Sequence, residues 1–126
     1  MQARKLGLKT GLRISLDEAP PGWELADPPG GLLDVEAPSP ADVIIGFFRA
    51  ADEIGRRLPA LAERIFPGGA VWVAWPRRAG GHTSDITDNV IRGHALPLGL
   101  VDVKVAAIDD DWSGLRLVWR AALRAR

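Results

Sequence analysis

Two runs of consecutive apolar residues, at positions 43–48 and 70–75, are separated by a segment with helical periodicity. Apolar residues on consecutive rather than alternating positions are typical of a strand that is buried on both faces, as in a parallel sheet covered by helices. Between the two runs, apolar residues from Ile54 to Ile65 recur at intervals of four, three and four positions, which places them on one face of a helix. A strand, a helix and another buried strand in this order predict a βαβ unit, and therefore a parallel sheet.

Proline and glycine set the limits of the helix in this unit. Pro59 lies inside the periodic segment, so either a short helix ends near Arg57 and a second begins with Pro59 in its first turn, or one helix continues with a kink. Gly68 and Gly69 follow Pro67 and are expected to end the helix, because glycine tolerates the left-handed conformation of a helix exit.

The segments on either side continue the alternation of strands and helices. A strand is expected at residues 12–16 and a short second strand at 31–36, both before the βαβ unit. After the unit, Thr83 or Ser84 is the expected N-cap of a further helix, which Gly99 ends.

The C-terminal part contains two more strands, at residues 101–107 and 115–119, and a basic tail or short helix at 121–126. The connection between the two strands is short, which predicts an antiparallel hairpin. The expected fold of residues 1–126 is therefore a single three-layer α/β domain. Its Rossmann-like sheet is mostly parallel with a C-terminal antiparallel hairpin, and helices cover both faces.

Composition excludes several classes of protein. The chain has no cysteine, which removes disulfides, thiolate metal sites and a cysteine nucleophile. It has no run of about 18 apolar residues and no signal-peptide pattern, so neither a membrane nor secretion is predicted and a cytoplasmic location is expected. The net charge is zero, so no nucleic-acid partner is predicted.

The charges are nevertheless segregated along the chain. Residues 1–16 contain four bases and no acid, whereas residues 17–42 contain seven acids and no base. A solvated acidic face is the favoured interpretation. The alternative is one half of a surface for self-association, which makes a homo-oligomer a further hypothesis.

Two resemblances follow from these elements. The order of helix, Pro-Gly-Gly, buried strand, helix, the turn GLVDVKV at 99–105 and a final hairpin resembles the C-terminal half of a class I, Rossmann-like methyltransferase. Nearly the whole chain is also similar to a family of small bacterial proteins classed as domain of unknown function 3052. That similarity is carried by KLGLKTGLRI (5–14), APPGW (19–23), ADVII (41–45), WVAWPRR (72–78), TSDITDNV (83–90), GLVDVKV (99–105) and WSGLRLV (112–118). The first resemblance implies a truncated methyltransferase-like fold, and the second implies no activity.

The methyltransferase resemblance implies S-adenosylmethionine as the cofactor. Binding it on this fold needs a glycine-rich turn after the first strand and an acid at the end of the second. The first strand is followed by Asp17-Glu18-Ala-Pro-Pro-Gly22, which lacks the Gly-x-Gly pattern, and proline removes backbone donors. Asp34 or Glu36 lies at a suitable distance for the acid, but both also belong to the acidic run. No cofactor is therefore predicted, and S-adenosylmethionine is the alternative.

Candidate ligand-binding residues gather where the parallel strands end. In an open parallel sheet, ligands bind beyond the carboxyl ends of the strands. Arginine forks and the amides of a helix N-terminus suit an anion such as phosphate, although the same arginines can pair with acids of the 17–36 segment or face solvent. His82 at this edge is interpreted first as an exposed loop histidine; a proton-transfer role needs an acid partner, for which Asp17 and Glu18 after the first strand are the candidates. The candidate residues are Trp75, Arg77, Arg78, His82, Thr83, Ser84, Asp17 and Glu18.

These patterns favour a non-catalytic binding or regulatory module whose partner is an unknown protein or a small anionic ligand. No catalytic residue is assigned, because Ser84 lacks the Gly-x-Ser-x-Gly context of a nucleophile, and no metal site is predicted, because the two histidines lack a ligand spacing. The alternatives are a methyltransferase with a divergent cofactor loop, which is the enzyme class if there is one, and a self-associating structural protein.

Overall fold

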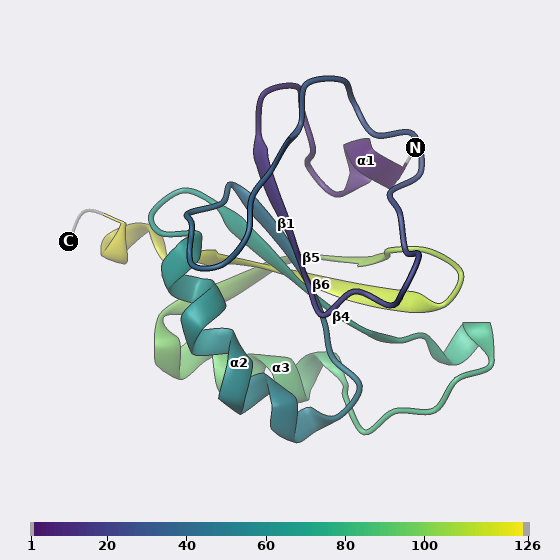
Figure 1. Cartoon of the computed structure of the whole chain (residues 1–126). Coiled ribbons are helices and arrows are strands. Elements are labelled where there is room, and N and C mark those ends of the chain that lie inside the picture. The colour runs from purple at the N-terminus through teal and green to yellow at the C-terminus, as the bar shows by residue number, and fades with distance from the viewer. Residues whose placement is uncertain (1, 125–126) are drawn as a thin grey trace.

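The computed structural model describes residues 2–124 as one six-stranded sheet flanked by helices (Figure 1). The strand order is β2-β1-β3-β4-β6-β5, and all strands run in the same direction except β6, which is antiparallel to both of its neighbours. The mostly parallel sheet and the antiparallel hairpin predicted from the sequence are confirmed. The strands are β1 (Arg13–Asp17), β2 (Leu33–Asp34), β3 (Val43–Phe47), β4 (Ala70–Pro76), β5 (Leu100–Ala107) and β6 (Trp112–Trp119).

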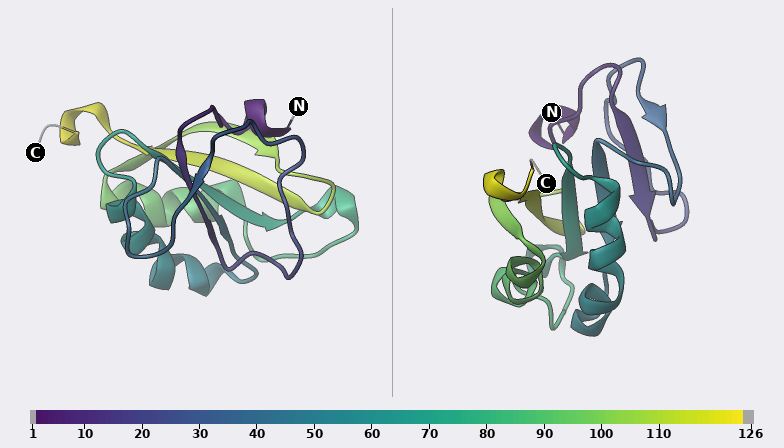
Figure 2. Two further views of the ribbon diagram at one scale, coloured as in Figure 1. Left: turned by 45° about the horizontal axis from the view of Figure 1, so that its top comes forward. Right: turned by 90° about the vertical axis from the view of Figure 1, so that its left-hand side faces the viewer.

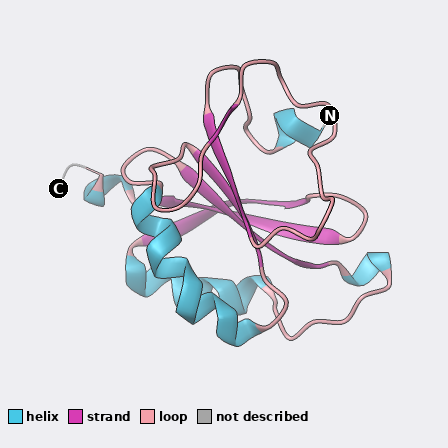
Figure 3. Ribbon diagram, in the orientation of Figure 1, coloured by secondary structure: helices cyan, strands magenta, loops and turns pink. Residues whose placement is uncertain are grey.

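The two longer helices, α2 (Ala51–Arg64) and α3 (Asp88–Ala95), lie on the same face of the sheet (Figure 2). Helices on both faces were expected. The opposite face is instead covered by the four-residue helix α1 (Gln2–Lys5) and by the loop between β1 and β2 (Figure 3). The reason is chemical, since this loop contains four prolines and three glycines between positions 20 and 31, which cannot sustain a helix.

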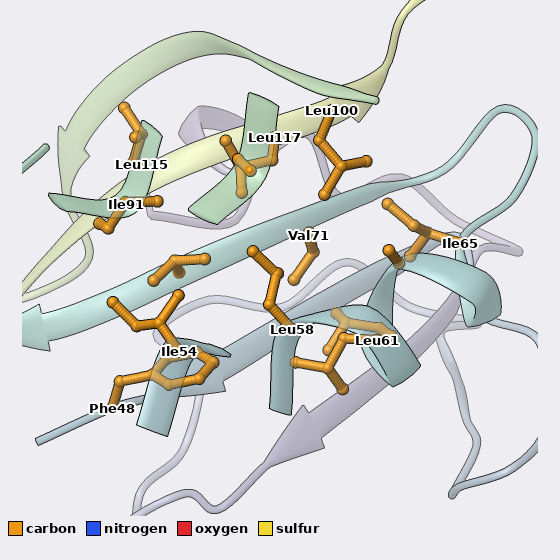
Figure 4. Packing of buried hydrophobic residues seen from close by; sticks show 14 of the residues in the cluster. Phe48, Ile54, Leu58, Leu61, Ile65, Val71, Ile91, Leu100, Leu115 and Leu117 are labelled. Atoms are coloured by element: carbon orange, nitrogen blue, oxygen red, sulfur yellow. The ribbon is translucent and has the colours of Figure 1, made fainter. Parts of the chain in front are cut away.

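The core on the helical face is built from the stripe that the sequence predicts. Side chains of α2, including Ile54, Leu58 and Leu61, pack with α3 against Val71 of β4 and Leu117 of β6 (Figure 4). Each of these five side chains is at most 5% exposed. Consecutive residues of β3 and β4 alternate between this core and a second core under α1, which explains why both strands are apolar at every position.

Helix α2 continues through Pro59, so a single helix replaces the alternative of two short ones. Pro59 is exposed, and its ring therefore lies on the solvent side of the helix. The helix does not end through a left-handed glycine as expected, because neither Gly68 nor Gly69 has a positive φ. Ile65 is the C-cap, and the Gly69 amide donates to the Ile65 carbonyl at 2.8 Å.

Helix α3 begins later than predicted. Its N-cap is Thr87, whose side chain accepts a hydrogen bond from the Val90 amide at 3.2 Å, and not Thr83 or Ser84. The Ser84 hydroxyl instead accepts from the Ile86 amide at 3.0 Å within the preceding turn. Gly99, with φ 99°, follows a short 3₁₀ turn, Leu96–Leu98, and ends the helical segment as predicted.

An ion pair ties the start of β1 to the start of β3. The Arg13 guanidinium lies 3.1 Å from the Asp42 carboxylate, which also accepts the Arg13 amide at 2.7 Å. The side-chain hydrogen bond from Arg13 holds the pKa of Asp42 below its ordinary value. The contact fixes the register of the two strands that lead to the carboxyl edge of the sheet.

Candidate functional site

The carboxyl ends of β3 and β4 and the start of β6 surround a pocket of about 610 Å³. β6 reaches this edge because it runs antiparallel to β4, with Trp112 opposite Pro76. The pocket thus lies where ligands bind in open α/β sheets. Its walls are Pro20, Arg49, Pro76, Gly81, His82, Thr83, Asp111 and Trp112.

One wall of the pocket is a buried tryptophan covered by an arginine. Trp112 is 7% exposed and meets Phe47 edge-on, with ring centroids 5.0 Å apart at an interplanar angle of 88°. The guanidinium carbon of Arg49 lies 5.3 Å from the Trp112 ring centroid, within the range of a cation–π contact. Arg49 is exposed and, within the described residues 2–124, its side chain takes part in no ion pair, so its charge is available at the pocket mouth.

The lining of this pocket also includes a histidine and its acid. His82 Nε2 lies 3.0 Å from Asp111 Oδ1, and both side chains are solvent-exposed. The acid predicted for this histidine was Asp17 or Glu18, which is wrong. Asp111 lies in the turn of the β5–β6 hairpin, where Asp109 Oδ1 accepts the amides of Asp111 at 2.8 Å and of Trp112 at 2.9 Å.

A second pocket of about 360 Å³ lies beside the first, on the side of α3. The two pockets share Pro76 and His82 as a common wall. The predicted residues Trp75, Arg78 and Ser84 line this second pocket together with His82. Thr83 lines the first pocket, so five of the eight candidates are brought together around the end of β4.

The two neighbouring arginines have different environments. Arg78 is exposed and lines the second pocket, whereas the half-buried Arg77 lines neither of the two pockets. The Arg77 amide donates to the Asp111 carbonyl at 2.8 Å, which ties the loop after β4 to the hairpin turn. Among residues 2–124, neither arginine forms an ion pair, so the alternative of pairing with acids of the 17–36 segment is not observed.

Asp17 and Glu18 lie apart from this group. Asp17 forms an ion pair with Arg57 of α2, and Arg57 Nη1 also donates to the Phe47 carbonyl at 2.8 Å. Arg57 contacts Glu53 at 3.0 Å and lies 4.0 Å from the centroid of the Phe48 ring. Its guanidinium therefore bridges the ends of β1 and β3, which is the point where the strand order reverses.

Glu18 follows β1 directly and has φ 57°, a left-handed conformation that is unfavourable for a residue with a Cβ. It is exposed and lines neither pocket at the carboxyl edge. The turn after β1 thus begins with a non-glycine residue in a strained conformation, followed by Pro20 and Pro21.

The sequence patterns missed Asp111 as a site residue and did not select Trp112, a possible pocket residue by its position at a strand end, or Arg49. A signal for the first two was present, since the turn of an antiparallel hairpin that follows a parallel strand lies at the carboxyl edge of that strand. Within residues 2–124, no group of three or more potential metal-ligating side chains occurs. No helix in that range combines the length and apolarity needed to cross a membrane.

Comparison with known proteins gives a family and a fold. A family described as "Protein of unknown function (DUF3052)" matches residues 25–121. No curated protein matches the chain.

Two solved structures resemble the fold. Fibrillarin from Aeropyrum pernix, crystallised with natively bound S-adenosyl-L-methionine, has a TM-score of 0.55 and 15% identity, over 93% of this chain and 73% of that one. The fibrillarin of a fibrillarin/Nop5p complex has a TM-score of 0.53 and 12% identity, over 90% and 75%. The predicted Rossmann-like, methyltransferase-type fold is confirmed. Sequence identities this low support a similar fold and not a shared function.

Proposed function

The chain belongs to the DUF3052 family of proteins of unknown function, and we propose that it is a non-catalytic binding module that takes a small anionic ligand at the carboxyl edge of its sheet. The observation that carries the proposal is the guanidinium of Arg49, which has no ion-pair partner among residues 2–124 and lies over Trp112 in the lining of the larger pocket. A guanidinium that already rests on an aromatic ring keeps its N–H fork free for phosphate or carboxylate oxygens.

The surrounding charges favour the same class of ligand. The acids that line the two pockets, Asp111 and Asp88, contact His82 and Arg92 respectively. Arg49 and Arg78 have no such partner among residues 2–124, which leaves an excess of positive charge around the end of β4. The Thr83 and Ser84 side chains add hydroxyl groups to the two pockets.

The adjacent arginines provide a matched test of this proposal. A thermal-shift screen against nucleotides, adenosyl compounds and phosphorylated metabolites should give a stabilising ligand, since ligand at 100 times its Kd adds about 2.7 kcal/mol to the free energy of unfolding. Titration calorimetry with that ligand should show an affinity about 10- to 100-fold lower in R49Q or R78Q, because each loses a charge-assisted hydrogen bond. R77Q should bind as the wild type does, because Arg77 lines neither pocket.

An equal loss of ligand affinity in R77Q and R78Q would indicate a general effect of net charge. It would contradict a binding site at these pockets. A screen without any stabilising anion would contradict the proposal as a whole. A protein partner captured through the same edge, and lost in R49Q, would identify the alternative partner class.

S-adenosylmethionine is the alternative ligand, because a fibrillarin of similar fold binds it. The residues at the tips of β1 and β2 do not fit an adenosyl group. The cofactor needs a glycine-rich turn with free amides after β1, whereas here Glu18 is left-handed and two prolines follow. The Arg57 bridge from Asp17 to the Phe47 carbonyl also lies across the neighbouring carboxyl ends of β1 and β3, where the strand order reverses. We therefore derive no methyl-transfer step.

The absence of cofactor binding is a measurable expectation. Titrating the purified protein with S-adenosylmethionine in a calorimeter should give no saturable heat at micromolar ligand. R57Q serves as a comparison, since it removes the bridge without adding a glycine-rich turn, and it should remain equally inert. Saturable binding of S-adenosylmethionine to the wild type would place the methyltransferase above the anion-binding module.

A further inference from the structure

Two cations face each other on the sheet surface opposite α2 and α3. Lys104 of β5 is the register partner of Arg116 of β6. Leu115 and Leu117, the neighbours of Arg116, belong to the core under the helices, so Arg116 points to the other face. Like charges directly opposite each other destabilise an antiparallel pair. Their juxtaposition therefore requires an explanation.

Among residues 2–124, no carboxylate forms an ion pair with either of these cations. Within the same residues, the side chain of Arg116 makes no hydrogen bond. Arg116 Nε is inaccessible to solvent and has no acceptor in that part of the chain. A buried N–H without a partner is costly, since it has lost its water without gaining another acceptor.

The N-terminal segment passes directly over the pair and adds positive charge. Lys104 Nζ donates to the Lys5 carbonyl at 3.0 Å, at the end of α1. Gly7 has φ 79°, and a Cβ built on it would lie 3.8 Å from Arg116 Nη2 and 3.9 Å from Nε. The side chains of Arg4 and Lys5 are exposed on the same short helix. The backbone of residues 5–7 thus lies against both Lys104 and Arg116.

We propose that Lys104 and Arg116 form a binding site for a tetrahedral oxyanion, either free phosphate or the phosphoryl group of a larger molecule. We call it the Lys104–Arg116 site. A guanidinium presents parallel N–H donors that match two oxygens of such an anion, and an ammonium is a point charge for a third. A bound dianion also converts the repulsion between the two strands into mutual attraction. The site is independent of the carboxyl-edge pockets, which neither residue lines.

Nuclear magnetic resonance titration tests the Lys104–Arg116 site. Inorganic phosphate is added to ¹⁵N-labelled full-length protein while chloride keeps the ionic strength constant. The amide signals of Gly7, Lys104 and Arg116 should shift and saturate. K104Q and R116Q should each weaken the affinity at least tenfold, whereas R120Q, which removes an exposed cation beyond the end of β6, should leave it unchanged. A parallel titration with glycerol 3-phosphate shows whether a phosphate monoester also binds at the Lys104–Arg116 site.

The result is decisive even if R116Q does not fold, because Lys104 is exposed and K104Q removes only its charge and its hydrogen bond to the Lys5 carbonyl. Shifts that follow ionic strength alone, or wild-type affinity in K104Q, would overturn the proposal. Binding at the carboxyl-edge pockets is recognised separately, since it moves the signals of Arg49, Arg78 and His82 and persists in K104Q.

Discussion

Replacing Gly69 with alanine should lower the free energy of unfolding by roughly 3 kcal/mol, through overpacking against backbone. A Cβ at this position would lie 2.7 Å from the Asp42 carbonyl oxygen, 2.9 Å from that of Ile65 and 3.0 Å from that of Ala41. All three atoms belong to backbone that is fixed by hydrogen bonds, including Ala70 N to Asp42 O at 2.9 Å. No flexible side chain can move aside, so the junction of α2, β3 and β4 has to open.

Gly68 is the matched control for this substitution. It also lacks a positive φ, and a Cβ there would meet no heavy atom within 4 Å. G68A should therefore be neutral or slightly stabilising, because alanine reduces the conformational entropy of the unfolded chain. Urea denaturation of both variants measures the difference. If G69A and G68A unfold within 1 kcal/mol of each other, the close approach at position 69 does not govern this junction.

The βαβ unit was predictable because its sequence pattern is produced by burial itself. β3 and β4 are covered on both faces, so every position is apolar, and α2 contacts the sheet along the single stripe from Ile54 to Ile65. The role of the glycines after α2 could not be read in the same way. A glycine that is needed for close packing and a glycine that is needed for a left-handed φ look identical in a sequence.

Local capping was predicted at the wrong residue for a similar reason. Thr83, Ser84 and Thr87 are equally good N-caps by composition, and each precedes an acid within two residues. The choice depends on the loop that enters α3. Asp85, which would lie in the first turn of the helix if Thr83 or Ser84 were its N-cap, accepts the Ala51 amide at 2.9 Å at the start of α2. This contact holds Asp85 in the loop before α3, and it has no local sequence signal.

The sequence indicated where the candidate residues lie in the fold, but not which side chains pair with one another there. The loop after β4 was correctly placed at the carboxyl edge of the sheet, because that placement follows from strand direction alone. The pairing of His82 with Asp111 and of Asp17 with Arg57 depends on contacts across 29 and 40 positions of the chain. The polar face of an amphipathic helix gives no indication that one of its arginines, Arg57, reaches across two strands.

Replacing Trp72 should have the second large effect, with a loss of about 3–5 kcal/mol in the free energy of unfolding for W72A. Trp72 is fully buried at the centre of the core under α1, and its indole Nε1 donates to the Leu6 carbonyl at 3.0 Å. The substitution removes the largest fully buried side chain of that core and leaves the Leu6 carbonyl without its indole donor. W75A should cost much less, because Trp75 is only partly buried at the end of β4.

W72F separates the packing of Trp72 from its hydrogen bond. Phenylalanine retains most of the apolar volume but has no donor for Leu6, so the N-terminal segment should loosen while the sheet stays folded. Hydrogen exchange should then accelerate at the amides of Leu6 and Leu8 and remain slow at those of β3 and β4. Because Gly7 lies over Arg116, the same variant should also weaken phosphate binding at the Lys104–Arg116 site, without a change in either of its cations. Unchanged exchange at Leu6 would show that the segment is held by its apolar side chains, Ala3, Leu6 and Leu8, and not by the indole.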